Sequence, residues 1–588
     1  MAVRRGFAIV VAFIAMVVCV ALAGVVVLYL VLSRGPAVAS GTTLVLRPGG
    51  EVQEAPPGDV VGALVGGASL TVQGFVETLQ RAARDTRVTG LLLQPDALDL
   101  PYWGRLQELR DAVLAFRMSG KPVVAFLEYG GEREYYLASA ADKVLLLPAS
   151  PLDLTGVASY EVFLRGFFDR VGVTPDFLQI AEYKTAPNQL TERGFTPAHR
   201  EMAESLNRDL YDQLVRGIAV SRGMTEAEVR ALIDDGPFLP EEALRAGLVD
   251  GLAYEDQLDE LAAELRGDDA TISRMDAPDY ARTRTGAAGR RGGPRVALLY
   301  ATGVIASGRS GYDPVNGPVA GSQSLVEQIR RIGDDESIRA VILRIDSPGG
   351  SSVASDVVWR ELQVLRQRWP DRPIIASMSD VAASGGYYIA LPAHAIVAQP
   401  GTLTGSIGIY AGKFTVGGAL EKLGIGTGTL TAGANADIYS PFTPFTPDQR
   451  ARIDASLQAF YDGFVQRVAD SRGTTVERIR DLARGRVWTG AQARANGLVD
   501  ELGGMDVAVR LAKARAGIGA DEDVELVVFA PRRTFYEALL ERIGGTAGEG
   551  ALLRALGGDV AAGVRAVSAA ARFRRGEPLA LMPFAVFH

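Results

Sequence analysis

The chain has 588 residues, more than one hydrophobic core supports, which predicts two or three domains. Apolar residues make up 48% and charged residues 22%, a composition typical of globular proteins and not of disordered ones. The net charge of -8 comes without a long run of Lys or Arg, so nucleic acid is not an expected partner.

Cysteine and histidine are scarce. The single cysteine, Cys19, excludes disulfides within the chain and zinc sites built from thiolates. Three histidines, His199, His394 and His588, are too few and too scattered for the usual His-rich metal site, so no metal is expected. Only six of the 61 basic residues are lysines, which makes a lysine at an unusual place informative.

The N-terminal region carries a candidate membrane segment. Residues 7–32 are uncharged and, as a helix, would extend about 39 Å, enough to cross a hydrocarbon core. Arg4 and Arg5 precede this run, so the positive-inside rule places residues 1–6 in the cytoplasm and the bulk of the chain on the far side of the inner (plasma) membrane, in the periplasmic or extracytoplasmic space. A cleaved signal peptide is the alternative, since Ala21-Leu22-Ala23 resembles a cleavage site. The run continues well past the usual signal-peptide core, which favours an uncleaved single-pass anchor.

Most of the chain is an internal repeat. The motifs Ser-Arg-Gly-x-Thr and Gly-Leu-Val-Asp both recur at an offset of 250 residues, at 221–225 and 471–475, and at 247–250 and 497–500. This predicts two copies of one domain, residues 40–265 and 296–530. Residues 266–295, rich in Gly, Ala, Arg and Asp without apolar periodicity, are the predicted linker.

Strand and helix patterns alternate in the second copy. Apolar runs of strand length occur at 296–300, 340–345, 373–377 and 396–399, and residues 357–368 show helical spacing. The alternation predicts an α/β domain with a largely parallel sheet, and helices are expected after Pro197 and after Pro447. Residues 531–588 are predicted to be a helical tail. Its apolar end, 579–587, suits packed core or an oligomer contact better than a membrane span.

Two glycine-containing loops of the second copy suggest chemistry. Ser384 lies between small residues after a predicted strand, and the N–H of Gly385 would lie where an oxyanion forms. The loop containing Gly349 and Gly350 would supply a second N–H. The structural alternative for the loop containing Gly349 and Gly350 is a tight strand-to-helix turn, and for Ser384 it is a helix N-cap.

The first copy supplies the candidate base. It has Glu132 at the position equivalent to Ser384, but it carries Lys184 where the second copy has no lysine. His394 follows Ser384 too far along a helix for a hydrogen bond, and His199 is expected to be a capping or surface residue. A lysine acts as a base only where burial lowers its pKa; a surface lysine is the alternative. The sequence favours a Ser-Lys dyad.

Four motifs together resemble a known family, the signal peptide peptidases of the protease IV type, long form (peptidase family S49), within the Clp protease and crotonase-like fold. The motifs are Leu343-Arg-Ile-Asp-Ser-Pro-Gly-Gly350, Ala382-Ala-Ser-Gly-Gly-Tyr-Tyr-Ile-Ala390, Gly401-Thr-Leu-Thr-Gly-Ser-Ile-Gly-Ile409 and Glu182-Tyr-Lys-Thr-Ala186. The resemblance implies two tandem Clp protease/crotonase-like α/β domains with helical extensions, preceded by one transmembrane helix. It also implies a membrane-anchored serine endopeptidase that degrades cleaved signal peptides and other extended peptides as a homotetramer, without a metal, nucleotide or other cofactor.

By the same resemblance, Ser384 is the nucleophile and Lys184 the general base. Gly385 and Gly350 are the oxyanion donors, and Ser406 helps to hold the lysine ammonium. Asp346 stands where the family more often has Asn.

Two other functions remain open from the sequence. A crotonase-like acyl-CoA enzyme would use the same oxyanion geometry for a thioester enolate, and an inactive peptide-binding scaffold would need no nucleophile. Binding of coenzyme A would indicate the first, and the presence of Ser384 and Lys184 argues against the second.

Overall fold

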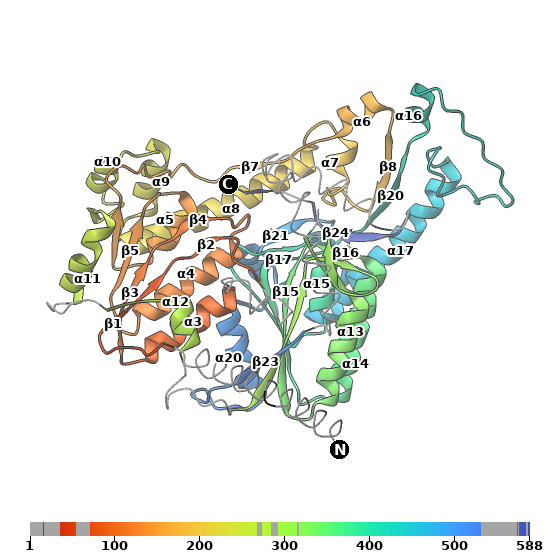
Figure 1. Ribbon diagram of the computed structural model, residues 1–588. Helices are drawn as coiled ribbons and strands as arrows, with labels where there is room; N and C mark the ends of the chain where they lie inside the picture. Colours follow the sequence, from red (N-terminus) through yellow and green to blue (C-terminus); the bar gives the residue numbers. More distant parts are fainter. Residues whose placement is uncertain are drawn as a thin grey trace, which may run out of the picture.

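The protein is described by a computed structural model in which two bodies of mixed strand and helix lie side by side (Figure 1). The described residues are 36–54, 71–266, 273–283, 292–313, 317–530, 576–583 and 586–587, with Met16 and Phe573. The predicted anchor, residues 7–32, lies outside them apart from Met16. Among the residues described, every helix is too short or too polar to cross a membrane.

The first half of the chain forms a six-stranded sheet in which every neighbouring pair is parallel. In spatial order its strands are β10 (Ser273–Asp276), β1 (Thr42–Leu46), β3 (Val88–Leu93), β5 (Val123–Leu127), β6 (Lys143–Leu146) and β9 (Gly251–Leu252). The central strands β3 and β5 are short, mostly apolar runs buried on both faces, as expected for a parallel sheet covered by helices.

Helices pack around this sheet. They are α3 (Val72–Arg84), α4 (Gly104–Arg117), α5 (Glu132–Ala138), α8 (Pro197–Arg222), α9 (Glu226–Asp235), α10 (Pro240–Arg245), the 3-10 helix η1 (Glu255–Gln257), α11 (Leu258–Arg266) and α12 (Ala277–Arg282). Helices α3, α8 and α9 each begin after a threonine whose side chain caps the helix. The Thr196 side chain accepts a hydrogen bond from the His199 N–H at the start of α8, where Pro197 is the first helical residue. The helix predicted after Pro197 is confirmed.

The interval predicted as a linker, 266–295, contains regular structure. Strand β10 pairs with the outer edge of β1, and α12 follows it. The Tyr280 side chain of α12 is buried and its hydroxyl donates to Asp85 at 3.0 Å. The linker prediction is therefore wrong for residues 273–282, because a free strand edge offers hydrogen bonds to a segment without apolar periodicity.

The second half forms an eight-stranded sheet. Its path is β21 (Val487–Thr489), β19 (Leu403–Gly405), β17 (Ile374–Ala383), β15 (Ile338–Ser347), β11 (Arg295–Thr302) and β23 (Glu525–Phe529), and β18 (Ala395–Ala398) joins β17 to β22 (Glu501–Leu502). All of its neighbouring pairs are parallel except β19 with β21. This confirms the predicted α/β class and the largely parallel sheet.

The helices of the second half are α13 (Ser322–Asp334), α14 (Ser352–Arg368), α15 (Gly385–Ala390), α17 (Pro447–Arg472), α18 (Val476–Leu482), α19 (Gly490–Asn496) and α20 (Met505–Arg515). Helix α17 has the same length as α8 and begins in the same way, with a threonine cap, Thr446, before a proline. The repeat seen in the sequence is therefore also visible in the caps and lengths of these two long helices.

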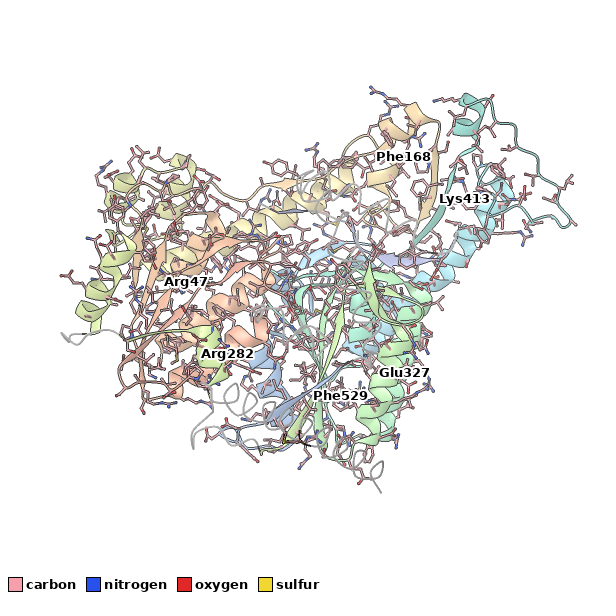
Figure 2. All side chains as sticks on the ribbon, in the orientation of Figure 1. Arg47, Phe168, Arg282, Glu327, Lys413 and Phe529 are labelled. Atoms are coloured by element: carbon pink, nitrogen blue, oxygen red, sulfur yellow. The ribbon has the colours of Figure 1, made fainter. Side chains whose placement is uncertain are left out.

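A third sheet contains strands from both halves. In spatial order it runs β13 (Gly311–Asp313), β14 (Gly317–Gly321), β12 (Val304–Ala306), β16 (Gly349–Ser351), β24 (Leu579–Leu581), β20 (Tyr410–Thr415) and β8 (Thr174–Gln179). Strand β8 belongs to the first half and pairs antiparallel with β20 of the second. With α6 (Arg165–Val171), α7 (Asn188–Thr191) and α16 (Gly417–Lys422) these two strands form an arm at the upper right of Figure 1, where Phe168 and Lys413 are labelled in Figure 2.

The described part of the C-terminal tail is strand and not helix. Residues 579–581 form β24, and β25 (Val586–Phe587) pairs with β7 (Ser159–Tyr160). The expectation of a helical tail is wrong here, because an apolar segment lying between two strand edges satisfies its backbone by pairing. Its burial agrees with the expectation of packed core. Of the tail residues 531–572 the structure gives no description.

A further short pair, β2 (Gly49–Gly50) with β4 (Asp96–Leu98), lies in the first half.

The two halves pack directly against each other. The start of α4 lies against β17: a Cβ placed on Gly104 would be 2.7 Å from the Ser379 carbonyl oxygen. The Arg105 N–H, at this helix start, donates to the Asp380 carboxylate at 2.7 Å. Val381 and Ala383 of β17 belong to the hydrophobic core of the first half. The contact fixes β17, the strand that leads to Ser384, relative to the other copy.

Candidate active site

Ser384 lies at a sharp turn between β17 and α15. Its φ of 54° and ψ of -110° are strained for a residue with a side chain. It occupies the N-cap position of α15, and its backbone carbonyl accepts from the Tyr388 N–H at 2.9 Å, but its hydroxyl makes no capping bond. The simple N-cap interpretation is therefore not what the structure shows. The hydroxyl points to other partners.

The Lys184 side chain reaches this hydroxyl from the other half of the chain. Lys184 lies in the loop between β8 and α7, and its Nζ donates to Ser384 Oγ at 2.7 Å. Nζ also donates to the Oγ and the carbonyl oxygen of Ser406, both at 3.0 Å. All three residues are fully buried. The three polar atoms around the amine are neutral, and burial lowers the pKa of Lys184 well below its usual range.

The loop of Lys184 is held by a turn of the second half. Gly485 has φ +81°, and a Cβ placed on it would lie 2.3 Å from the Lys184 backbone nitrogen. The Tyr183 N–H donates to the Arg484 carbonyl at 3.0 Å, and the Arg484 side chain pairs with Glu182. A side chain at position 485 would push the lysine out of place, so the second half positions the amine as well as the hydroxyl.

The two glycine loops meet beside Ser384. Gly349 has φ +99°, and a Cβ placed on it would lie 2.7 Å from the Gly385 backbone nitrogen. The N–H of Gly349 donates to Ser347 Oγ at 3.2 Å, which fixes the loop. Gly350 follows in β16, which pairs with β12 on one side and with β24 on the other. The predicted oxyanion residues, Gly350 and Gly385, are thus on adjacent loops next to the serine.

Glu132, the first-half equivalent of Ser384, has a different environment. Its carboxylate accepts from the N–H groups of Thr155, at 2.9 Å, and Gly156. Burial raises the pKa of Glu132, although these N–H donors oppose the effect. The first half therefore uses this position to hold its own loop.

Neither His394 nor His199 bonds to Ser384. His394 Nδ1 accepts from the Ile374 N–H at 3.0 Å, in agreement with its expected exclusion as a base. His199 is fully buried beside Glu161, with Nε2 3.0 Å from the carboxylate, and packs against Phe163 and Phe195. The expectation of a surface His199 is wrong: the first turn of α8 faces inward here, and an aromatic cluster with one carboxylate surrounds the ring.

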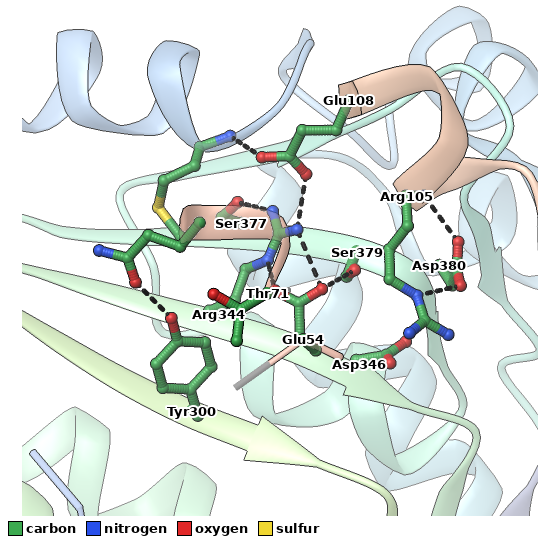
Figure 3. Close-up of polar contacts among 12 residues, drawn as sticks. Glu54, Thr71, Arg105, Glu108, Tyr300, Arg344, Asp346, Ser377, Ser379 and Asp380 are labelled. Atoms are coloured by element: carbon green, nitrogen blue, oxygen red, sulfur yellow. Dashed lines mark hydrogen bonds and ion pairs between the residues drawn. The ribbon is translucent and has the colours of Figure 1, made fainter. Parts of the chain in front are cut away.

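A buried network of charges lies between the halves, and the sequence reasoning missed most of it (Figure 3). Arg344, on β15, is fully buried and pairs with Glu54 at 2.5 Å and Glu108 at 2.6 Å. Arg105 pairs with Asp380 next to them. The available signal was an arginine inside the apolar strand run Val341-Ile-Leu-Arg-Ile345, since a charge in a buried strand requires partners.

Asp346 belongs to this network and does not face the oxyanion loops. Its Oδ1 accepts from the Val381 N–H at 3.1 Å. Burial raises the pKa of Asp346 to about 7; the charge of Arg105 opposes this shift, and the nearby carboxylates Asp380 and Glu54 add to it. A carboxylate at this position therefore does not approach the predicted oxyanion donors directly.

Asp346→Asn is expected to stabilise the folded protein, and the gain in stability over the parent should be larger at about pH 8 than at about pH 5. The folded state binds a proton on Asp346 up to a pKa of about 7, whereas the unfolded state loses it near 3.8, so folding stability falls as pH rises between these values. An amide keeps the bond from the Val381 N–H and has no charge to bury. Melting temperatures of parent and variant at about pH 5 and about pH 8 test this. An equal difference at both pH values would contradict it.

Comparisons with known proteins agree with the repeat. The sequence profile of peptidase family S49 matches residues 115–268 and 366–519, one segment in each half. A chloroplastic serine protease SPPA from Arabidopsis thaliana is 34% identical over 81% of this chain and 70% of its own length. Protease 4 from Salmonella typhi is 33% identical over 74% of this chain and 70% of its own.

Among solved structures, a mutant of the 1510-N membrane-bound stomatin-specific protease with a substrate peptide is 17% identical and covers 42% of this chain and 97% of its own. Its TM-score of 0.25 is too low to support an argument about the fold. The relatives and the two matched segments support a serine peptidase, and the chain belongs to peptidase family S49.

Proposed function

We propose that this chain is a membrane-anchored serine endopeptidase that uses a Ser-Lys dyad to cut extended peptides, among them released signal peptides. The observation that carries the proposal is the 2.7 Å hydrogen bond between Lys184 Nζ and Ser384 Oγ, formed by two side chains that are 200 positions apart and fully buried. A structural serine would not need a desolvated amine as its partner.

The proposed reaction is acyl transfer. Neutral Lys184 takes the proton of Ser384 while Oγ attacks the peptide carbonyl carbon. The N–H groups of Gly385 and Gly350 stabilise the oxyanion. The lysine ammonium, held by Ser406, then protonates the leaving amine, and water activated by the same lysine hydrolyses the acyl enzyme.

The remaining parts of the proposal concern location and assembly. Residues 7–32 anchor the chain with residues 1–6 in the cytoplasm and the peptidase outside it. Two Clp protease/crotonase-like domains of one chain form each site, and four chains form a homotetramer. No cofactor takes part.

Labelling of the serine tests the dyad directly. A fluorophosphonate probe is added to the full chain and to Lys184→Ala, and the adduct is located by mass spectrometry. We expect labelling of Ser384 that is lost in Lys184→Ala. Equal labelling without Lys184 would refute the base, and labelling elsewhere would refute the nucleophile. A chain that binds coenzyme A and is not labelled would favour the acyl-CoA alternative, and one that binds peptides without labelling would favour the scaffold.

The pH dependence of kcat/KM is expected to follow the loss of the proton from the Lys184 amine. Below its pKa, Lys184 is protonated and cannot accept the serine proton; above it, the amine is neutral and active. Because burial lowers this pKa below the ordinary value of 10.5, activity should rise with pH and reach its plateau before an ordinary lysine would be neutral. A pH-rate profile measures this. A flat profile between about pH 6 and 9 would contradict the proposed base.

A further inference from the structure

The C-terminal segment of the chain lies in a slot one strand wide. Strand β24 is antiparallel to β16 on one side, with Gly350 opposite Ala580, and to β20 on the other, with Tyr410 opposite Leu579. Without this segment the facing edges of β16 and β20 would have no strand between them. An extended peptide that adds to exposed strand edges is a common mode of peptide recognition.

The register places one tail carbonyl at the proposed oxyanion donors. The Met582 N–H donates to the Pro348 carbonyl at 2.8 Å, and the Ser352 N–H donates to the Pro578 carbonyl at 3.2 Å. Hydrogen-bonded pairs recur every second residue in an antiparallel ladder, so Gly350 and Ala580, midway between these two pairs, form such a pair. The Gly350 N–H therefore faces the Ala580 carbonyl.

Close packing at the two glycines supports the same position. A Cβ placed on Gly349 would lie 2.0 Å from the Ala580 carbonyl oxygen, and one on Gly385 would lie 3.2 Å from it. The oxygen thus lies against both loops that flank Ser384. A substrate carbonyl about to be attacked by Ser384 would need this location.

The side chains of the segment show what the slot accepts. Ala580 is fully buried, and Leu579 and Leu581 are almost fully buried in a cluster with Ala186 and Tyr410. Glu577 bonds to the Ser351 hydroxyl at the start of the segment. The slot therefore holds a small residue where the carbonyl meets the glycines, with apolar residues on both sides.

We propose that residues 577–583 occupy the substrate-binding slot of their own chain. They lie there as a substrate would, with Ala580 at the cleavage position, and a substrate enters only when they leave. The inference rests on the proposed function, and it names the preferred substrate as an extended apolar peptide with a small residue at the position of Ala580. The buried state of Ser384 and Lys184 corresponds to this occupied form.

The first test is Leu581→Asp in the full chain. A carboxylate is disfavoured in the buried position of Leu581, so the segment leaves more often and the fraction of open sites rises. We expect kcat/KM for an extended fluorogenic peptide to rise about tenfold, mainly through a lower KM. The matched control is Leu430→Asp, the same change at a fully exposed leucine, which should leave kcat/KM unchanged. Parental kcat/KM in Leu581→Asp would overturn the inference.

The second test adds the C-terminal segment as a separate peptide. A fluorescent peptide with the sequence of residues 576–583 should bind Leu581→Asp, as measured by anisotropy, and should inhibit it competitively. The same peptide carrying Ala580→Trp should do neither, since the buried position has no room for an indole. Absence of binding, or equal binding of both peptides, would overturn the inference. Because binding requires no catalysis, this result is separate from a failure of Ser384 labelling, which would refute the proposed function.

The third test uses the parental chain and does not depend on the folding of a variant. Hydrogen exchange of the Met582 amide, which is bonded to Pro348, is followed with and without a peptidyl chloromethyl ketone attached at the site. We expect faster exchange of this amide when the inhibitor is bound. Unchanged protection with the inhibitor in place would show that β24 is a permanent strand of the sheet, and would overturn the inference.

Discussion

Lys184→Met is expected to lower kcat for peptide hydrolysis by about 10³-fold or more while the protein stays folded. Methionine is close to lysine in length and suits the buried position, but it cannot accept the Ser384 proton or return it to the leaving amine. The melting temperature should not fall, because the replacement removes an amine that is desolvated in the folded state. Steady-state kinetics with an extended peptide and thermal unfolding measure both effects.

The matched control is Lys121→Met. The Lys121 ammonium donates to the Ala82 and Asp85 carbonyls at the end of α3, so its loss should leave kcat unchanged. The double variant Ser384→Ala with Lys184→Met should be no slower than either single variant, because residues that act as a unit are not additive. Activity above about one tenth of the parental kcat in Lys184→Met would refute the lysine base.

Arg344→Met is expected to destabilise the protein by about 3–5 kcal/mol, since breaking a buried ion pair leaves its partners without compensation. Glu54 and Glu108 would remain buried between the halves without the guanidinium that both contact. Burial raises the pKa of Glu108 even with Arg344 present; for Glu54 burial acts in the same direction, but the attraction of Arg344 outweighs it and lowers the pKa. The free energy of unfolding from urea titration measures the effect.

Arg330→Met provides the control at the surface. Arg330 forms a two-point pair with Glu361 at 3.0 Å, but its side chain is mostly exposed, and such pairs contribute about 0–1 kcal/mol. A loss of similar size in both variants would mean that the network between the halves contributes no more than a surface pair. Peptidase activity of Arg344→Met per folded molecule would also report how far β17 depends on the network for the position of Ser384.

The sequence was sufficient to predict the α/β class, the repeat and two side chains that the structure brings together. The repeat was visible because both copies keep the residues that begin and end their long helices, such as Thr196 and Thr446 before their prolines. Ser384 and Lys184 were found by comparing the copies, since each lies where the other copy has a different residue. Local pattern and internal comparison were therefore the informative signals.

Features that depend on distant contacts could not be predicted. The burial of the His199 side chain depends on contacts with Glu161 and the surrounding aromatic residues, which no local pattern specifies. The position of β24 depends on two strand edges that are far from it in the sequence. Tertiary pairing overrode the helical pattern expected for the described part of the tail and the absence of pattern in residues 273–282 of the linker.

The division of the Lys184 and Ser384 pair between the two halves has a consequence during synthesis. A growing chain that ends before Ser384 has no nucleophile, and one that ends before Gly485 lacks the turn that encloses the lysine loop. Until then the amine remains in water, where it is protonated and inert as a base. With the proposed roles, a nascent chain has no peptidase activity until synthesis has passed both Ser384 and the turn at Gly485.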